Sequence, residues 1–197
     1  MLANGYKPFK ENPESLDINK TLNGENFRNY VDDVKTIQDF AKANRKKIIE
    51  TIVKTLSETN PTTIIDQIES VHNYLDFKGN TAILRKGAIS AKLDELLIIP
   101  INMRDGSLIC KGLGNKDWNY SAPHGAGRRL SRTQAKEDIN IETFKKQMQG
   151  IYTTCINKAT IAEAPDAYKD IKNIKEDIQE TAKIIEHLKV IYNYKHK

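Results

Sequence analysis

The feature that most constrains the fold is a segment rich in Gly, Asn, Ser and Pro at residues 112–129. Clusters of these residues end regular structure and mark turns or loops. A long helical pattern and then several strand-like runs precede this segment, and helical patterns resume after it. Because helices and strands are segregated along the chain instead of alternating, the sequence predicts the α+β class.

The helical patterns have apolar residues at three- and four-residue steps, which is the period of one helix face. The longest pattern runs through residues 26–58 and ends before Asn60-Pro61. A short helix or turn is expected at residues 62–69. After the loop, helices are expected at residues 131–137, 141–149 and 171–188.

The strand-like runs lie before the loop, at residues 81–91, 95–101 and 108–111, with a further β-like run at 190–194. We therefore expect a compact mixed sheet flanked by long helices. Residues 1–25 show no period and read as an irregular lead-in, so the organised part of the chain is expected at residues 26–197.

Length and charge narrow the classes of protein. The 197 residues suit one domain, and the net charge of +5 fits either a phosphate-bearing partner or simple solubility. No apolar run approaches the roughly 18 residues of a membrane helix, and residues 1–10 lack a signal-peptide pattern, which predicts a cytoplasmic protein without a membrane partner. Cys110 and Cys155 have no CxxC spacing, so no disulfide framework is expected; Cys110 is expected to be a core residue and Cys155 to be inert.

The sequence HGAGRR, at residues 124–129, carries the chemistry. Glycines allow successive backbone N–H groups to converge on an anion, and arginine binds phosphate through two parallel hydrogen bonds. A histidine at the mouth of such a nest can donate a hydrogen bond to phosphate or attack phosphorus through a neutral ring nitrogen. The alternative is a glycine loop before a helix with a surface histidine, and these six residues alone leave both interpretations open.

The surrounding motifs shift the balance toward the phosphate-binding interpretation. The chain contains, in order, FAKANR, VHN, LRKGAI, IIP, MRDGS, GLGN, SAPHGAGRR, AYKDI and a lysine near the end. Together these resemble the RtcB family of RNA ligases. The resemblance implies an RtcB-like fold and a reaction that joins an RNA 3′-phosphate or 2′,3′-cyclic phosphate to a 5′-hydroxyl, using GTP and manganese.

The resemblance also implies a role for each matching residue. His124 matches the histidine that accepts GMP and forms a histidyl-guanylate. His72 matches a manganese ligand, and Arg128 and Arg132 match basic residues suited to RNA or phosphate. The nucleotide contacts are expected from His72, Asn73, Pro100, Ile101, Asn102, Met103, Ser107, Gly125, Ala126, Gly127, Tyr168 and Lys195.

Some of these residues have simpler interpretations. Taken alone, His72 fits a hydrogen-bonded core histidine, Tyr168 fits a loop anchor, and Lys195 fits a solvated tail residue. Ile101-Asn102 stands where family members often have Gly followed by Ser or Asp. Residue 101 is therefore bulkier than glycine at a position whose backbone is expected to contact the nucleotide.

The family's enzymes are about twice as long, and their metal site draws an acidic residue, a cysteine and further histidines from an N-terminal half. Only His72 of that set is expected here, so residues 26–197 read as a C-terminal half, incomplete on its N-terminal side. An N-terminal half is then an expected partner, and apolar surface left uncovered by it favours self-association. The alternative function is a non-catalytic remnant that binds RNA or a phosphate ligand.

Overall fold

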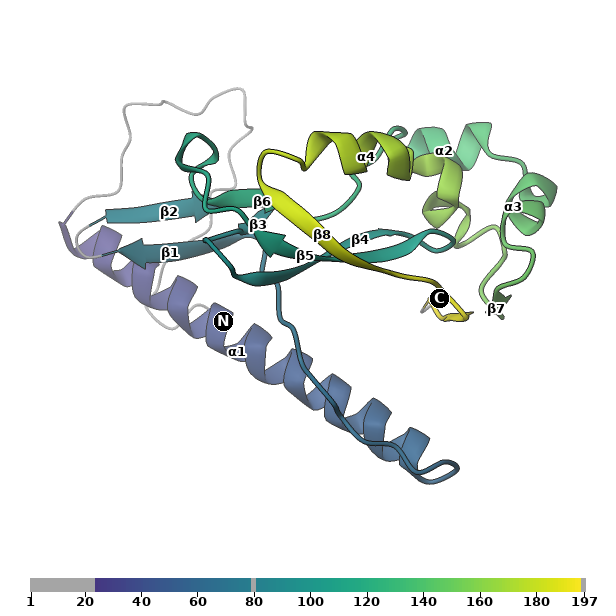
Figure 1. The fold of residues 1–197 in the computed structure, drawn as a ribbon, viewed down its shortest axis with the longest axis horizontal. Helices are drawn as coiled ribbons and strands as arrows, with labels where there is room; N and C mark the ends of the chain where they lie inside the picture. The colour runs from purple at the N-terminus through teal and green to yellow at the C-terminus, as the bar shows by residue number, and fades with distance from the viewer. Residues whose placement is uncertain (1–23, 79–80, 196–197) are drawn as a thin grey trace. The chain divides into compact units, whose positions relative to one another are not determined.

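The computed structural model describes residues 24–78 and 81–195 (Figure 1). The chain divides into two compact units, residues 1–67 and 68–197. The lead-in predicted for residues 1–25 lies outside the described residues, except for Gly24 and Glu25, which begin the first helix.

The first unit contains the long helix α1 (Gly24–Ser57), which confirms the helix predicted at residues 26–58. Glu25 in its first turn and Lys54 in its last complement the helix dipole. The predicted short helix or turn at residues 62–69 is wrong, because residues 61–72 form no helix, strand or turn. Ile65 there is 97% exposed, so no core contact supports a short helix. Among the described residues, no helix is both long and apolar enough to cross a bilayer.

The second unit contains small sheets, all antiparallel except the last. A three-stranded sheet in the order β4-β5-β8 forms its centre (Figure 1). The strand pairs are β1 (Tyr74–Lys78) with β2 (Thr81–Arg85), β3 (Ala88–Ser90) with β6 (Ser121–Pro123), β4 (Leu96–Asn102) with β5 (Gly106–Gly112), β5 with β8 (Ala182–Leu188), and β7 (Tyr152–Thr153) with β9 (Tyr192–Asn193).

Short helices follow the loop. They are α2 (Arg132–Asp138), α3 (Ile141–Gln147) and α4 (Ile171–Asp177), with 3₁₀ turns η3 (Ile161–Glu163) and η4 (Pro165–Ala167). A further 3₁₀ turn, η2 (Lys116–Trp118), lies within the loop segment itself. Helices α2 and α3 confirm predicted helices. Ser131 and Gln134 form a capping box that begins α2, and Gly150, with a φ of 86°, follows the end of α3.

Two hydrophobic cores lie in this unit. In the first, alternate residues of β4 and β5 pack against Ile174 and Ile178 at the end of α4. The second gathers Met103, α2, α3 and the 3₁₀ turns η3 and η4 around Phe144. Tyr168 packs against both clusters, so the segment that carries it lies where the two cores meet.

The helix predicted at residues 171–188 is wrong beyond Asp177. The chain turns at residues 178–181 and continues as β8, which pairs with β5. Ile174 and Ile178 satisfy a helical period, but pairing along β5 outweighs local helix propensity in the next seven residues. The predicted single sheet with long helices is also too simple, because α2, α3 and α4 have 7 residues each and the sheets are small.

A buried arginine connects the β1–β2 hairpin to residues 119–121 of the predicted functional loop. Arg85, at the end of β2, is 1% exposed. Burial would raise the pKa of the Asp76 carboxyl, but hydrogen bonds from Lys92 and Arg85 outweigh it and hold that pKa below its usual value. The guanidinium of Arg85 donates to Asp76 Oδ2 at 2.8 Å, Tyr74 Oη at 3.2 Å, Ser121 Oγ at 3.0 Å, and the carbonyls of Asn119 at 3.2 Å and Tyr120 at 3.3 Å.

Replacing Arg85 by methionine should therefore destabilise the chain. The change removes a guanidinium that is 1% exposed together with its hydrogen bonds to Tyr74, Asp76 and Ser121, and we expect the free energy of unfolding to fall by about 3 kcal/mol. Urea unfolding followed by circular dichroism measures it. Lys111→Met is the control, because Lys111 and Asp94 form an exposed pair at 3.0 Å whose loss should cost less than about 1 kcal/mol. Equal losses in the two variants would contradict the role given to Arg85.

Candidate functional site

The loop that follows β6 is locked against β4. The Ala126 N–H donates to the Pro100 carbonyl at 3.1 Å. A Cβ atom placed on Gly125 would lie 3.1 Å from the same carbonyl oxygen, so the close approach favours glycine there. Gly127 has a φ of 70°, which also favours glycine. Pro100 lies on the edge strand β4, where its missing N–H interrupts no hydrogen bond between strands.

His124 stands at the start of this loop with one ring nitrogen engaged. Its Nδ1 lies 2.6 Å from the Gly87 carbonyl oxygen, in the turn between β2 and β3. Because a carbonyl can only accept, Nδ1 carries the proton and, in the neutral ring, Nε2 holds a lone pair. The His72 ring stacks on the His124 ring, with centroids 5.0 Å apart. The Gly87 carbonyl and the His72 ring thus both fix the orientation of the His124 imidazole.

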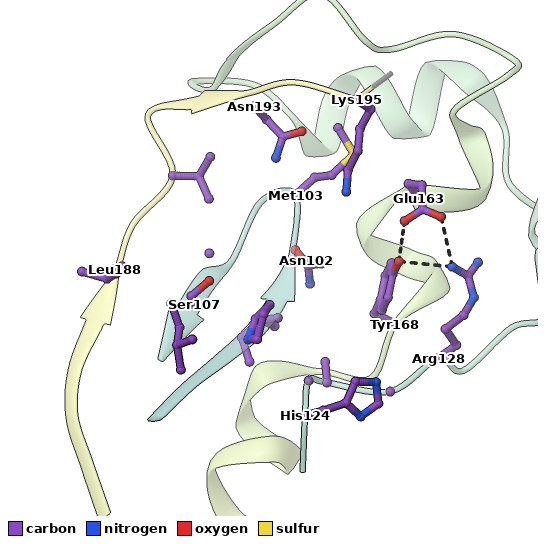
Figure 2. A pocket seen from close by; sticks show the side chains of 18 of the residues that line it. Asn102, Met103, Ser107, His124, Arg128, Glu163, Tyr168, Leu188, Asn193 and Lys195 are labelled. Atoms are coloured by element: carbon purple, nitrogen blue, oxygen red, sulfur yellow. Dashed lines mark hydrogen bonds and ion pairs between the residues drawn. The ribbon is translucent and has the colours of Figure 1, made fainter. Parts of the chain in front are cut away.

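His124 opens onto a cavity of about 880 Å³ (Figure 2). This volume falls within the range of small-molecule sites. The cavity brings together every residue predicted for the site except Asn73, whose side chain contacts Gly87 instead. The predicted residues that line it are His72, Pro100, Ile101, Asn102, Met103, Ser107, His124, Gly125, Ala126, Gly127, Arg128, Arg132, Tyr168 and Lys195.

Arg128 and Tyr168 are held together by a carboxylate that the sequence analysis did not single out. Glu163 accepts a hydrogen bond from the Tyr168 hydroxyl at 2.6 Å and lies 3.5 Å from Arg128 Nη1 (Figure 2). Burial and this carboxylate raise the pKa of Tyr168 to about 12, so the phenol stays a donor. Glu163 lies in the segment EAPDAYKDI, and its closeness in sequence to Tyr168 was the available signal.

The two arginines of the site differ in what surrounds them. Arg128 donates to the Leu130 carbonyl at 3.0 Å, to the Tyr168 hydroxyl at 3.1 Å and to the Ala162 carbonyl. Its guanidinium is therefore largely satisfied inside the protein. The Arg132 side chain is 77% exposed, and its Nε lies 3.8 Å from Glu163 Oε1. Arg132 is thus the more accessible cation of the pair.

The turn between β4 and β5 forms another wall of the cavity. Asn102 Oδ1 accepts hydrogen bonds from the backbone N–H groups of Arg104 at 2.9 Å and Asp105 at 2.8 Å. A Cβ atom on Gly106 would fall 2.0 Å from the Leu188 carbonyl oxygen, so β8 can pass beside this turn only because residue 106 is glycine.

Ile101 is 3% exposed and belongs to the first core. Its extra bulk is therefore accommodated in the core.

The C-terminal segment brings Lys195 to the cavity by way of a buried cysteine. The Lys195 N–H donates to Cys155 Sγ at 3.0 Å, and the Cys155 thiol lies 3.2 Å from the Lys195 carbonyl oxygen. The pairing of β7 with β9 and the stacked rings of Tyr152 and Tyr192 hold the same segment. Cys155 therefore anchors the backbone of Lys195, one of the predicted nucleotide contacts. Cys110 is a core residue as predicted, and burial raises its thiol pKa to about 11.

The described residues do not form a complete metal site. No group of three or more His, Cys, Asp or Glu side chains suited to a metal ion occurs among them. His72 lines the cavity beside His124, where it is accessible as a single ligand. A functional metal site uses at least three protein ligands, so a metal held by His72 would need ligands from outside the described residues.

Comparison with known proteins places these features in a family. Residues 13–196 match the family described as tRNA-splicing ligase RtcB. The chain is 35% identical over 181 residues to RNA-splicing ligase RtcB1 of Escherichia coli strain ATCC 25922, covering 84% of this chain and 44% of that protein. It is 41% identical over 83 residues to tRNA-splicing ligase RtcB of Aeropyrum pernix, covering 40% of this chain and 17% of that protein. The chain thus spans less than half the length of these relatives. It belongs to the RtcB family.

Proposed function

We propose that this chain forms the guanylate-accepting part of an RNA ligase. The ligase joins an RNA 3′-phosphate or 2′,3′-cyclic phosphate to a 5′-hydroxyl, and it consumes GTP. Membership of a family whose relatives are named RNA-splicing and tRNA-splicing ligases supports the reaction class. The observation that carries the assignment of the nucleophile is the His124 Nδ1 contact with the Gly87 carbonyl, which leaves Nε2 as the reactive nitrogen on the cavity wall.

His124 Nε2 attacks the α-phosphorus of GTP. A nitrogen–phosphorus bond forms, and the bond to the bridging oxygen breaks, so pyrophosphate leaves with the electron pair. The Nδ1 proton stays on the ring, and the Gly87 carbonyl stabilises the positive charge that develops there. An RNA 3′-phosphate oxygen then takes the guanylate from His124. The 5′-hydroxyl oxygen attacks the activated phosphate, loses its proton, and GMP departs.

The composition of the cavity fits a guanine nucleotide. Gly125 and Gly127 give backbone room for phosphate beside His124. The half-buried ring of Tyr168 suits the flat face of a base. Guanine presents the acceptors O6 and N7, to which the Lys195 ammonium can donate. The remaining contacts are proposed for His72, Pro100, Ile101, Asn102, Met103, Ser107 and Ala126.

Manganese is proposed as the metal of the complete enzyme, with His72 as one ligand. The described residues do not supply enough ligands, and the E. coli relative has more than half of its length outside the match. We propose that an N-terminal half supplies the remaining ligands. A bound divalent ion would neutralise phosphate charge.

The test of this function is covalent labelling by GTP. The chain is incubated with α-³²P-labelled GTP and manganese, with and without the N-terminal half of an RtcB relative. We expect acid-labile label on the wild-type chain and none on His124→Ala. His187→Gln is the matched control and should keep its label, because His187 lies on β8 and does not line the cavity. No label under either condition would refute the nucleophile and favour a non-catalytic chain that binds RNA or phosphate.

The different surroundings of the two arginines predict different effects of replacing them. Arg132→Gln should weaken binding of RNA with a 3′-phosphate by about tenfold and leave the unfolding midpoint nearly unchanged, because an exposed cation that bonds phosphate contributes little to folding. Arg128→Gln should lower the unfolding midpoint as well, since it breaks contacts with Tyr168 and the Ala162 carbonyl.

Fluorescence anisotropy at one fixed salt concentration measures the binding, with the same RNA ending in a 3′-hydroxyl as the comparison. An equal loss for both RNAs on Arg132→Gln would contradict a specific contact with the terminal phosphate.

A further inference from the structure

Asn73 is the one predicted site residue that does not line the cavity. Its side-chain Oδ1 accepts a hydrogen bond from the Gly87 N–H at 2.9 Å. The Asn73 backbone has a φ of 61°, a left-handed conformation that asparagine, aspartate and glycine adopt more readily than other residues. Asn73 directly follows His72, whose ring stacks on His124. Asn73 is thus bonded to the turn that contacts the nucleophile.

Gly87 connects Asn73 to His124. It lies between β2 and β3 with a φ of 67°, and its carbonyl is the group that contacts His124 Nδ1 at 2.6 Å. Glycine has more backbone freedom than any other residue, so its own preferences do not fix the direction of this carbonyl. The hydrogen bond from the Gly87 N–H to Asn73 restricts that freedom.

We propose that Asn73 is a positioning residue for His124. By holding Gly87, it aims the carbonyl that keeps the proton on Nδ1 and leaves Nε2 bare. The consequence for guanylate transfer rests on the proposed function, whereas the orientation of the ring does not. A direct contact between Asn73 and the nucleotide is the competing role, and the two roles predict different measurements.

Two substitutions isolate the hydrogen bond from the backbone conformation. Asn73→Asp keeps an acceptor oxygen at the same position, and Asn73→Gly removes it, while both residues tolerate the left-handed φ. Because Asn73 is exposed, both variants should fold, and matching unfolding midpoints check this. The pair therefore compares presence and absence of the acceptor on one backbone.

The first measurement is the tautomer of His124 in the nucleotide-free chain. Two-bond ¹⁵N–¹H correlation spectra of the neutral imidazole distinguish the protonated nitrogen from the bare one. We expect the Nδ1–H tautomer in the wild type and in Asn73→Asp, and a mixture of both tautomers in Asn73→Gly. An unchanged His124 spectrum in Asn73→Gly would overturn the proposal.

The second measurement separates the rate of guanylate attachment from the KM for GTP. In Asn73→Gly the rate should fall about fivefold, the effect of losing one hydrogen bond, with KM unchanged and the rate restored in Asn73→Asp. A raised KM at an unchanged rate would assign Asn73 to the nucleotide and overturn the positioning role. Since the tautomer is read without nucleotide, a chain that accepts no guanylate would refute the proposed function and leave the first measurement decisive.

Discussion

The buried guanidinium of Arg85 is the interaction on which the arrangement of the site depends. It joins strands β1 and β2 to residues 119–121, where β6 begins and leads to His124. Two residues after Arg85, the carbonyl of Gly87 meets His124 Nδ1. The same contacts that satisfy a buried charge therefore fix the distance between the turn that orients the ring and the loop that carries it. The stability of this unit and the orientation of the His124 ring therefore depend on the same set of hydrogen bonds.

The cavity lies where two hydrophobic cores meet, and this explains how its walls are held. Ala126 belongs to the first core and Met103 to the second, while Tyr168 packs against both. Polar groups then complete the walls. Glu163 links Tyr168 to Arg128, and Cys155 holds the backbone of Lys195. Rigid packing beneath a glycine loop allows the backbone to approach a ligand closely without losing its shape.

The sequence predicted those features that depend on residues close together in the chain, such as helix periodicity and short motifs. The three- and four-residue period gave α1, and the ordered motifs around His124 identified residues that the fold brings to one cavity. Features set by distant pairing could not be read in this way. Residues 182–188 look helical but pair with β5 as a strand. The contact of Glu163 with Arg128 and that of Gly87 with His124 appear only when segments far apart in sequence come together, since neither residue type signals its partner.

The proposed chemistry depends on one atom, Nε2 of His124, because the contact of Nδ1 with the Gly87 carbonyl leaves Nε2 available for bonding. The most direct measurement is NMR of the guanylylated protein with ¹⁵N-labelled histidine, in which coupling between ³¹P and ¹⁵N identifies the bonded nitrogen. We expect coupling of phosphorus to Nε2 of His124, with the proton retained on Nδ1. Phosphorus bonded to Nδ1, or to any residue other than His124, would contradict the proposed role of Nε2.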